Sequence, residues 1–351
     1  MVREYTEDTE NSDGSDASEA VRPPTSTDVA RLARVSQSTV SHVLNNVPNN
    51  RFTQETRDRV LAAAEALGYV PHAMARSLRF GHSNLVLMPV FDWPFNPDSF
   101  NFFQILSARL HELGYTVMMQ AGGPWSMPEA ARTWAALRPS GVFIPSENVT
   151  RQIVDVLRKA GTEVILALGA EVSPLVPTVV IDFTATGECA AQHLLSRGHR
   201  HLAVVVPRDP RILKIGLQRL RGVEKAGQAC GARVDRLDLD YSSEEASELA
   251  AKWKRRGHPT GVFAFNDEYG ALLMGALHDV GLSVPGDVAL IGCDNLPICN
   301  VVRPRLTSIS TSSTAAARAI AAYFDASIQG RSIGEPPEAL SSPQLVVRDS
   351  S

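Results

Sequence analysis

The sequence predicts an α/β protein in which a small bundle of helices precedes two lobes of doubly wound parallel sheet. Two patterns along the chain predict it. Residues 25–70 space their apolar side chains as helices do, and from residue 84 onward short apolar runs alternate with helical segments. The length of 351 residues suits two or more domains. Apolar residues make up 44% and charged residues 21%, which is typical of a globular chain.

Composition argues against several classes of protein. No run approaches the ~18 consecutive apolar residues of a membrane span. The acidic first twenty residues lack the apolar stretch of a secretory signal. Four cysteines in a chain of this length do not make a disulfide scaffold, which favours a reducing compartment. We therefore expect a cytoplasmic, nucleoid-associated protein with no cofactor, no metal site and no membrane partner.

The formal net charge of −4 conceals an asymmetry. Residues 1–20 carry seven acidic side chains and one basic one, whereas residues 21–80 carry eight arginines and four acidic side chains. The acidic segment has no periodic apolar face, so we predict a disordered tail over residues 1–24. A basic segment is compatible with nucleic-acid binding, although such a stretch is often only a solvated face.

Three short helices are predicted between residues 25 and 70. The stretch Thr25-Ser-Thr-Asp28 offers capping residues for the first, Ser36 and Thr53 are suited to cap the second and third, and Gly68 is suited to end the third. Two short helices separated by three or four residues make a helix-turn-helix. The apolar positions expected to face inward are Val29, Leu32 and Ala33 in the first helix, Val40, Val43 and Leu44 in the second, and Val60, Leu61, Ala64 and Leu67 in the third.

The second of these helices presents a polar face. Short polar side chains of this kind can reach base edges in a major groove, as expected of a recognition helix. A generic three-helix bundle with a polar face would have the same spacing, so periodicity alone leaves both interpretations open. The residues on this face are Gln37, Ser38, Ser41 and His42.

Three motifs in this region resemble the LacI/GalR family of bacterial transcription regulators. DVARLARVSQSTVSHVLN (residues 28–45) and ETRDRVLAAAEALGY (residues 55–69) resemble the family's DNA-binding headpiece. PHAMARSLR (residues 71–79) resembles its hinge helix. The signal is specific because all three occur in the right order and spacing. The resemblance implies a homodimer that binds a pseudo-palindromic operator in double-stranded DNA.

The resemblance also implies roles for single residues of the second helix. Gln37, Ser38 and His42 are expected to contact base edges. Contacts to phosphates fix the register on DNA without reading its sequence. The side chains expected nearer the phosphates are Ser36, Thr39 and Ser41.

In the hinge, the resemblance places Leu78 where the family wedges a leucine into the minor groove, with Ala75 and Arg79 beside it. Two departures from the family pattern bear on the operator sequence. Arg34 stands in the turn where Gly or Asn is usual, and a non-glycine residue there is expected to be mildly strained. The loop after the second helix is long, and its Arg51 is an additional candidate for DNA contact.

Beyond residue 84, apolar strands alternate with helices in a β-α order, which predicts parallel doubly wound sheets. Two such series predict two lobes, and ligands in such folds bind at the carboxyl ends of the strands. Strands are expected at residues 85–91, 116–120, 141–145, 164–168, 179–181, 201–206, 233–239, 261–265, 288–293 and 345–348. Helices are expected at residues 102–113, 129–137, 153–159, 187–196, 219–229, 244–255 and 269–280.

Five phrases in this part resemble the family's effector-binding core, which is similar to a periplasmic sugar-binding protein. The resemblance divides the chain into the acidic tail, a helix-turn-helix domain, a hinge helix with its linker, and a two-lobed domain for effector binding and dimerisation. The phrases are VID (180–182), HLLSRGH (193–199), FNDE (265–268), VPGDVALIGCDN (284–295) and RPRLTS (303–308). The corresponding domain ranges are 1–24, 25–70, 71–83 and 84–351.

Carrying the family's effector contacts over gives Arg219, Tyr241, Asn266 and Asp294. A guanidinium, an amide and a carboxylate can hydrogen-bond the hydroxyls of a sugar, and an aromatic ring can stack on its C–H face. Two alternatives stay open, because Asp294 could be a helix cap and Tyr241 a packing residue. A position in the first lobe that often carries an acid falls near Gly169 in this chain. Contacts from the first lobe are expected from Trp93 and Phe95, in a loop that departs from the family pattern.

No catalytic residue is predicted. The sequence has no P-loop, no Gly-x-Gly-x-x-Gly phrase and no Gly-x-Ser-x-Gly elbow. His199 and His201 are best interpreted as surface residues, and Cys293 and Cys299 lack the spacing of a zinc site. The sequence therefore predicts a DNA-binding transcription regulator, with repression favoured, whose operator affinity is switched by a small sugar-like effector. The alternatives are a ligand-independent regulator and a solute-binding protein, of which the latter would need a secretion signal and no headpiece.

Overall fold

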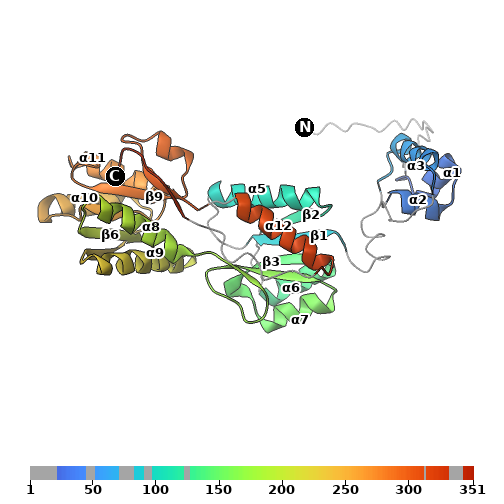
Figure 1. The fold of residues 1–351 in the computed structure, drawn as a ribbon, viewed down its shortest axis with the longest axis horizontal. Coiled ribbons are helices and arrows are strands. Elements are labelled where there is room, and N and C mark those ends of the chain that lie inside the picture. Colours follow the sequence, from blue (N-terminus) through green and yellow to red (C-terminus); the bar gives the residue numbers. More distant parts are fainter. Residues whose placement is uncertain are drawn as a thin grey trace, which may run out of the picture. The chain divides into compact units, whose positions relative to one another are not determined.

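The computed structural model describes residues 22–44, 52–70, 83–90, 97–121, 127–311, 314–331 and 343–351. The chain divides into two compact units, residues 1–76 and 77–351, and each is described by itself (Figure 1). Among the described helices, none combines the length and the apolar character that crossing a membrane would need.

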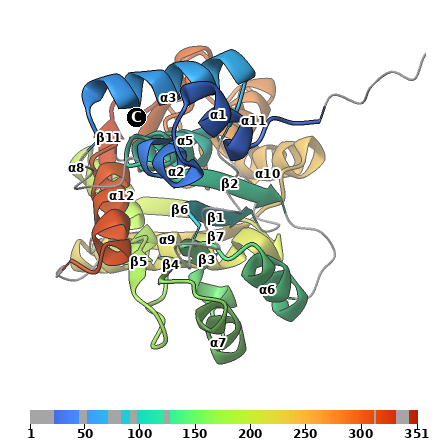
Figure 2. The ribbon, with the colours of Figure 1, turned by 90° about the vertical axis from the view of Figure 1, so that its right-hand side faces the viewer.

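The first unit contains three helices, α1 (Ser26–Ala33), α2 (Gln37–Leu44) and α3 (Gln54–Leu67), which are blue in Figure 2. Thr25 and Asp28 form a capping box, in which each side chain accepts a hydrogen bond from the other residue's backbone N–H. Hydrogen bonds from the Thr25 hydroxyl and the Thr25 N–H lower the pKa of the Asp28 carboxyl. Thr53 caps α3, and Gly68 ends it in the left-handed region at φ 61°. The predicted ends of α3 are confirmed, and Thr25 is the one of the four candidates that caps α1.

The inner face of this bundle differs from the prediction at two leucines. Leu32 and Leu61 are 53% and 48% exposed, whereas Ala30 and Ala63 are buried beside the valines. In each helix one edge of the predicted inner face is exposed and the opposite edge is buried instead, while the middle of the face is as predicted. Alanines allow two helices to approach closely, so they occupy the inner face and the leucines lie outside. The other predicted inward positions are buried or half-buried: Val29, Ala33, Val40, Val43, Leu44, Val60, Ala64 and Leu67.

The turn between α1 and α2 contains the left-handed residue that the sequence suggested. Arg34 has φ 53° and ψ 47°, and its N–H donates to carbonyl groups of Ala30 and Arg31. The left-handed conformation costs a residue with a Cβ roughly 1–2 kcal/mol. The turn therefore carries the mild strain expected for this position.

The second unit contains two sheets. In lobe 1 the order is β2-β1-β3-β4-β5 and all strands are parallel. Its strands are β1 (Leu85–Val90), β2 (Thr116–Ala121), β3 (Gly141–Pro145), β4 (Val164–Gly169) and β5 (Thr178–Val180). Its helices are α5 (Pro97–Glu112), α6 (Met127–Ala136), α7 (Arg151–Lys159) and α12 (Thr314–Ile328), with a short 3₁₀ turn, η1 (Ser146–Asn148).

Helices cover both faces of the lobe 1 sheet, because side chains along each strand alternate between them. Val86 and Met88 of β1 pack with α5 and α12, whereas Leu87 packs with α6 and α7. Burial on both faces explains why these strands are continuous apolar runs.

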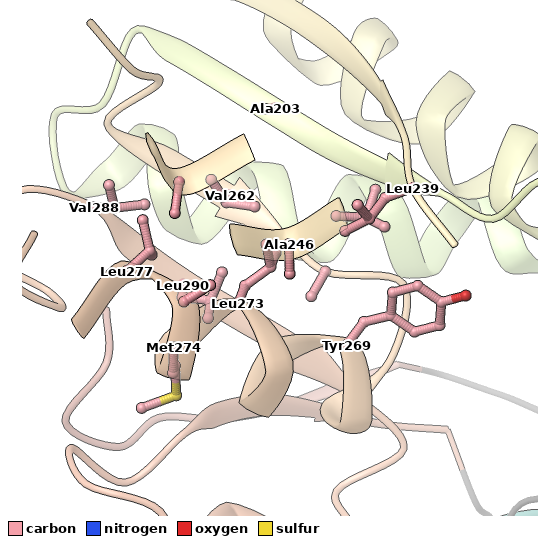
Figure 3. Close-up of a cluster of buried hydrophobic side chains, with 14 of the residues drawn as sticks. Ala203, Leu239, Ala246, Val262, Tyr269, Leu273, Met274, Leu277, Val288 and Leu290 are labelled. Carbon is pink, nitrogen blue, oxygen red and sulfur yellow. The ribbon is translucent and has the colours of Figure 1, made fainter. Parts of the chain in front are cut away.

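In lobe 2 the order is β11-β10-β9-β8-β6-β7, and only the pair β10–β11 is antiparallel among the described strands. The α8–α9 pair covers one face and the α10–α11 pair the other, where Figure 3 shows the packed side chains. The strands are β6 (His201–Val206), β7 (Arg233–Asp238), β8 (Gly261–Phe263), β9 (Ala289–Cys293), β10 (Thr307–Ser310) and β11 (Gln344–Val346). The helices are α8 (Phe183–Ser196), α9 (Pro210–Ala229), α10 (Ser243–Arg256), α11 (Asp267–Asp279) and the 3₁₀ turn η2 (Pro297–Asn300).

The doubly wound fold is confirmed, but one strand and one α-helix were not predicted, nor were the two 3₁₀ turns. Strand β10 is four residues long, and α12 has so many alanines that its apolar spacing is indistinct. Helix α12 returns to lobe 1, where it packs on α5 (Figures 1 and 2) and Phe324 stacks on Phe143 with ring centroids 4.8 Å apart. Gly141 is needed there, because a Cβ would collide with the Phe324 ring.

Candidate functional sites

The N-terminus of α2 is built by three hydroxyl groups. Ser36 caps the helix, since its Oγ accepts a hydrogen bond from the Thr39 N–H at 3.1 Å. The same Oγ lies 2.8 Å from Thr39 Oγ1 and 2.7 Å from Ser38 Oγ. The hydroxyls therefore cluster at a helix N-terminus, where partial positive charge favours an anion such as a phosphate.

The remaining predicted residues of α2 differ in how they are held. Gln37 is exposed, and its Nε2 donates to Ser26 Oγ at 2.8 Å, which orients the amide across to α1. His42 is half-buried and its ring stacks with Phe52 at a centroid distance of 6.2 Å. Ser41 is also half-buried. Sequence reasoning missed the supporting roles of Ser26 and Phe52, which become visible only when the helices are packed.

Four predicted DNA contacts lie outside the described residues: Arg51, Ala75, Leu78 and Arg79. The exposed polar residues of α2 in the described structure are Gln37 and Ser38, with its cap Ser36. They form one polar end of the helix-turn-helix, which is suited to contact a nucleic acid backbone and adjacent base edges.

Lobe 2 brings the predicted effector residues to the carboxyl end of its sheet. Asp294 follows β9, Asn266 follows β8 and Tyr241 follows β7, whereas Arg219 lies on α9. Arg219 and Asp294 are each only 5% exposed, and Arg219 Nη2 lies 3.7 Å from Asp294 Oδ1. Two residues that are 75 positions apart in the chain thus form a buried ion pair.

Arg219 is held by one carbonyl and two rings. Its Nη1 donates to the Phe265 carbonyl oxygen, and its guanidinium lies 4.9 Å from the Phe265 ring centroid and 5.8 Å from that of Phe183. Its Nε is buried and has no hydrogen-bond partner among the residues that the structure describes. A buried donor without an acceptor costs about 1–3 kcal/mol, so an acceptor from a ligand would be favourable here.

The burial of Arg219 follows from the close approach of α8 and α9. A Cβ on Gly187 of α8 would collide with the Arg219 carbonyl oxygen and lie 2.8 Å from its carbon. A Cβ on Gly222 of α9 would collide with the Thr184 carbonyl oxygen. Glycine at both positions lets the two helix backbones touch, and Arg219 lies on α9 at this contact.

The cap alternative applies to Asn266 and not to Asp294. Asn266 Oδ1 accepts a hydrogen bond from the Tyr269 N–H at 3.0 Å and caps α11. Its Nδ2 lies 3.4 Å from Glu268 Oε2. Asp294 caps no helix in the described structure; it has φ 92° and its N–H donates to the Ile309 carbonyl oxygen at 2.8 Å.

Tyr241 lies at the exposed end of an aromatic series. It is 62% exposed, and its ring centroid is 5.3 Å from that of Tyr269, which in turn is 5.7 Å from Phe265. Burial raises the pKa of Tyr269 to about 12, so its phenol stays neutral. Sequence reasoning missed Phe183, Phe265 and Tyr269, whose adjacency depends on three separate segments.

Lobe 1 contributes a serine where the family often has an acid. A side chain at Gly169 would collide with Ser146 Oγ and lie 3.0 Å from Ser146 Cβ, so the serine fills that space. An ion pair between Lys214 Nζ of α9 and Glu171 Oε1 of the loop after β4, 2.7 Å apart, connects the two lobes. The predicted contacts Trp93 and Phe95 lie outside the described residues.

The histidines and cysteines do not assemble into a metal site in the described part of the chain. His201 Nε2 lies 2.7 Å from an Asp235 carboxylate oxygen at the lobe 2 surface. Burial raises the pKa of Cys293 well above its usual range and that of Cys299 to about 12, so both thiols stay protonated.

Comparison with known proteins gives two family matches. Residues 25–72 match the model described as bacterial regulatory proteins, lacI family. Residues 191–351 match the model described as a periplasmic binding protein-like domain. The first match spans α1 to α3, and the second spans most of lobe 2 together with α12.

Similar proteins span most of the chain. It is 31% identical over 297 residues to the HTH-type transcriptional repressor PurR of Aliivibrio fischeri (strain MJ11), covering 81% of this chain and 86% of that protein. It is 30% identical over 296 residues to catabolite control protein A of Priestia megaterium, with the same coverage. Among solved structures, a transcriptional regulator CelR–cellobiose complex has a TM-score of 0.63 and 25% identity, covering 93% of this chain and all of the other. The Lac repressor dimer bound to operator and the anti-inducer ONPF has a TM-score of 0.75 at 24% identity, covering 94% and 99%, and shares the fold.

Proposed function

This chain belongs to the LacI family of bacterial regulatory proteins, and on that premise we propose that it represses transcription under the control of a small sugar-like effector. It is a DNA-binding transcription regulator with a periplasmic-binding-protein-like effector domain. Regulators of this family are not enzymes. The proposal goes further in assigning repression, a homodimer, a pseudo-palindromic operator in chromosomal DNA and the chemical class of the effector.

The observation that carries the effector proposal is the buried Arg219–Asp294 pair with its unpartnered Nε. A carboxylate and a guanidinium side by side offer acceptors and donors to vicinal hydroxyls. Tyr241 offers an exposed ring face, and the rings of Tyr269 and Phe265 lie between it and Arg219. The position is the carboxyl end of a parallel sheet, where ligands of doubly wound folds bind. The solved complex of the similar CelR contains cellobiose, which supports a sugar.

The homodimer proposal rests on the size of the headpiece. One headpiece presents a single short recognition helix, α2, and two-fold symmetry doubles the contact surface on DNA. The similar Lac repressor structure is a dimer bound to its operator. Selection of binding sites from a random DNA pool by the full chain should therefore yield two inverted half-sites. Recovery of single, unpaired half-sites would contradict the dimer.

Base readout by α2 predicts position-specific losses. Gln37→Ala and His42→Ala should each relax the preference at particular operator positions, by about 1–3 kcal/mol of discrimination per contact. Gln54→Ala, which removes the same amide from the start of α3, serves as the control and should leave every base preference unchanged. Binding constants for a set of single-base operator variants provide the measurement. A uniform loss across all sequences would mean that the two side chains touch phosphates only.

The hinge prediction concerns Leu78, which lies outside the described residues. Leu78→Ala should weaken specific operator binding by removing the minor-groove wedge, while salt-driven binding to random DNA stays nearly unchanged. Footprinting on the selected operator and on random DNA measures both. Unchanged operator affinity would contradict the assignment of residues 71–79 as the hinge helix.

A further inference from the structure

The loop that carries Asp294 has an unusual backbone. Asp294 and Asn295 are consecutive non-glycine residues in the left-handed region, at φ 92° and φ 50°. Such residues are energetically unfavourable and persist only where the surroundings hold them firmly. The conformation of this loop therefore depends on hydrogen bonds from surrounding residues.

Asp267, in the first turn of α11, holds both amides that follow Asp294. Its side chain is completely buried, and its Oδ2 accepts a hydrogen bond from the Leu296 N–H at 2.7 Å. Its Oδ1 accepts one from the Ser308 hydroxyl at 2.6 Å, and Ser308 Oγ accepts one from the Asn295 N–H at 3.0 Å. One amide is thus bound directly and the other through Ser308 of β10.

The carboxylate of Asp267 is itself confined. A Cβ on Gly292 of β9 would collide with Asp267 Oδ1 and lie 3.1 Å from the Asp267 Cα, so the glycine makes room for the carboxylate against the strand. The same loop is held from its other side by Arg348, whose Nη2 donates to Asn295 Oδ1 at 2.7 Å and whose Nη1 donates to the Leu306 carbonyl oxygen at 2.9 Å.

We propose that Asp267 is a positioning residue that fixes the backbone of residues 294–296, through Leu296 and Ser308, so that the Asp294 carboxylate faces Arg219. Its consequence for effector recognition rests on the proposed function of the Arg219–Asp294 pair. Asp267 contacts neither Arg219 nor a ligand in this role; it acts through the loop alone.

The charges around Asp267 give the proposal a pH dependence. Burial, with a smaller contribution from the Asp294 charge, raises the pKa of Asp267 to about 6, although the hydrogen bonds from Ser308, Leu296 and Cys299 lower it. The ordinary value is 3.8, so between about pH 4 and 6 the folded chain holds a proton that the unfolded chain has lost. This group's contribution to the free energy of unfolding therefore increases as the pH falls through that window. The other titratable groups that interact with it are Cys293 and Cys299, and these thiols in turn interact with Arg219 and Arg348 respectively.

A protonated Asp267 carboxyl costs less free energy to bury than a carboxylate. It is, however, a weaker hydrogen-bond acceptor for the loop amides. Protection of the Asn295 and Leu296 amides against hydrogen exchange, corrected for intrinsic exchange rates, should therefore fall in the wild type between about pH 7.5 and pH 5. Neighbouring amides of β9 and α11 should keep their protection. Asp267→Asn should lack this step, because it has no titrating group.

The test is residue-resolved hydrogen exchange on the full chain. At about pH 7.5, Asp267→Asn should lower the protection of the Asn295 and Leu296 amides by about tenfold or more. Leu296 loses its charge-assisted acceptor, and Asn295 loses the carboxylate that holds its own acceptor, Ser308 Oγ, in place. Asp287→Asn is the matched control, because Asp287 Oδ2 also accepts a backbone N–H and a hydroxyl, both from Ser283 at 2.7 Å, in an exposed loop of the same lobe. The control should leave both loop amides unchanged.

Ser308→Ala separates positioning from general stabilisation. It removes the acceptor of the Asn295 amide and leaves that of Leu296, so protection should fall at Asn295 and persist at Leu296. Unchanged protection in Asp267→Asn, or an equal loss spread over β9 and α11, would overturn the proposal. The failure of this proposal can be distinguished from failure of the proposed function. If the loop amides lose protection as expected but neither cellobiose nor ribose changes operator binding by the wild type, the positioning role of Asp267 stands and only the proposed class of effector is wrong.

Discussion

Replacing Gly222 with alanine is expected to destabilise the chain by about 2–3 kcal/mol, through overpacking against a rigid helix backbone. The new Cβ would collide with the Thr184 carbonyl oxygen and lie 2.8 Å from the Glu188 N, both in α8. Neither atom is the end of a flexible side chain, so α8 and α9 must move apart. Because Arg219 lies one turn earlier on α9, the same movement would disturb the effector site.

Gly275→Ala is the matched control. Gly275 lies in α11, also in lobe 2, and a Cβ there would meet no atom within 4 Å. Alanine should stabilise that helix by about 0.5–1 kcal/mol, because it has the higher helix propensity. Urea unfolding followed by circular dichroism measures both variants. Equal effects from the two substitutions would show that α8 and α9 are not in backbone contact.

Arg219→Ala is expected to abolish the response to effector while operator binding stays close to wild type. The substitution removes the buried donors beside Asp294, and a charge-assisted hydrogen bond is worth about 1.5–3 kcal/mol, or at least tenfold in affinity. Removing one partner of a buried ion pair also destabilises the fold. Asp294→Asn, which keeps the volume of the side chain, should therefore give the same loss of response with a smaller loss of stability.

Arg221→Ala provides the control for that prediction. Arg221 is exposed on the same helix, so its removal takes away the same charge without touching the Arg219–Asp294 pair. Operator affinity is measured for all the variants across a panel of sugars and sugar derivatives. A response of the Arg219 variant equal to that of the wild type would place the switch elsewhere in the molecule.

The parts of the fold that depend on local chemistry could be predicted from the sequence. The caps Thr25, Ser36 and Thr53 act within three residues of themselves, so the sequence contains the whole interaction. Leu32 and Leu61 were placed wrongly because two apolar residues compete for the inner face, and the neighbouring helix selects the alanine. That choice is made by packing between helices and is not encoded in the spacing of one helix.

The candidate effector site was likewise predictable only in part. The resemblance located Arg219 and Asp294, which the fold pairs, but it did not reveal Phe183 and Phe265 around the guanidinium. These contacts require segments from two different connections to meet at one end of a sheet. Asp267 was visible in the sequence as part of the phrase FNDE, yet its function depends on strand β10, which the sequence did not predict.

The most direct test of the account is the affinity of the wild-type chain for its selected operator, measured with and without each sugar of the panel. A ligand shifts a conformational equilibrium only by its differential affinity for the two states. The account predicts that at least one sugar-like compound changes the operator dissociation constant by about tenfold or more, corresponding to about 1.4 kcal/mol of differential affinity. Sequence-specific binding that no compound in the panel alters would contradict it and would favour a ligand-independent regulator.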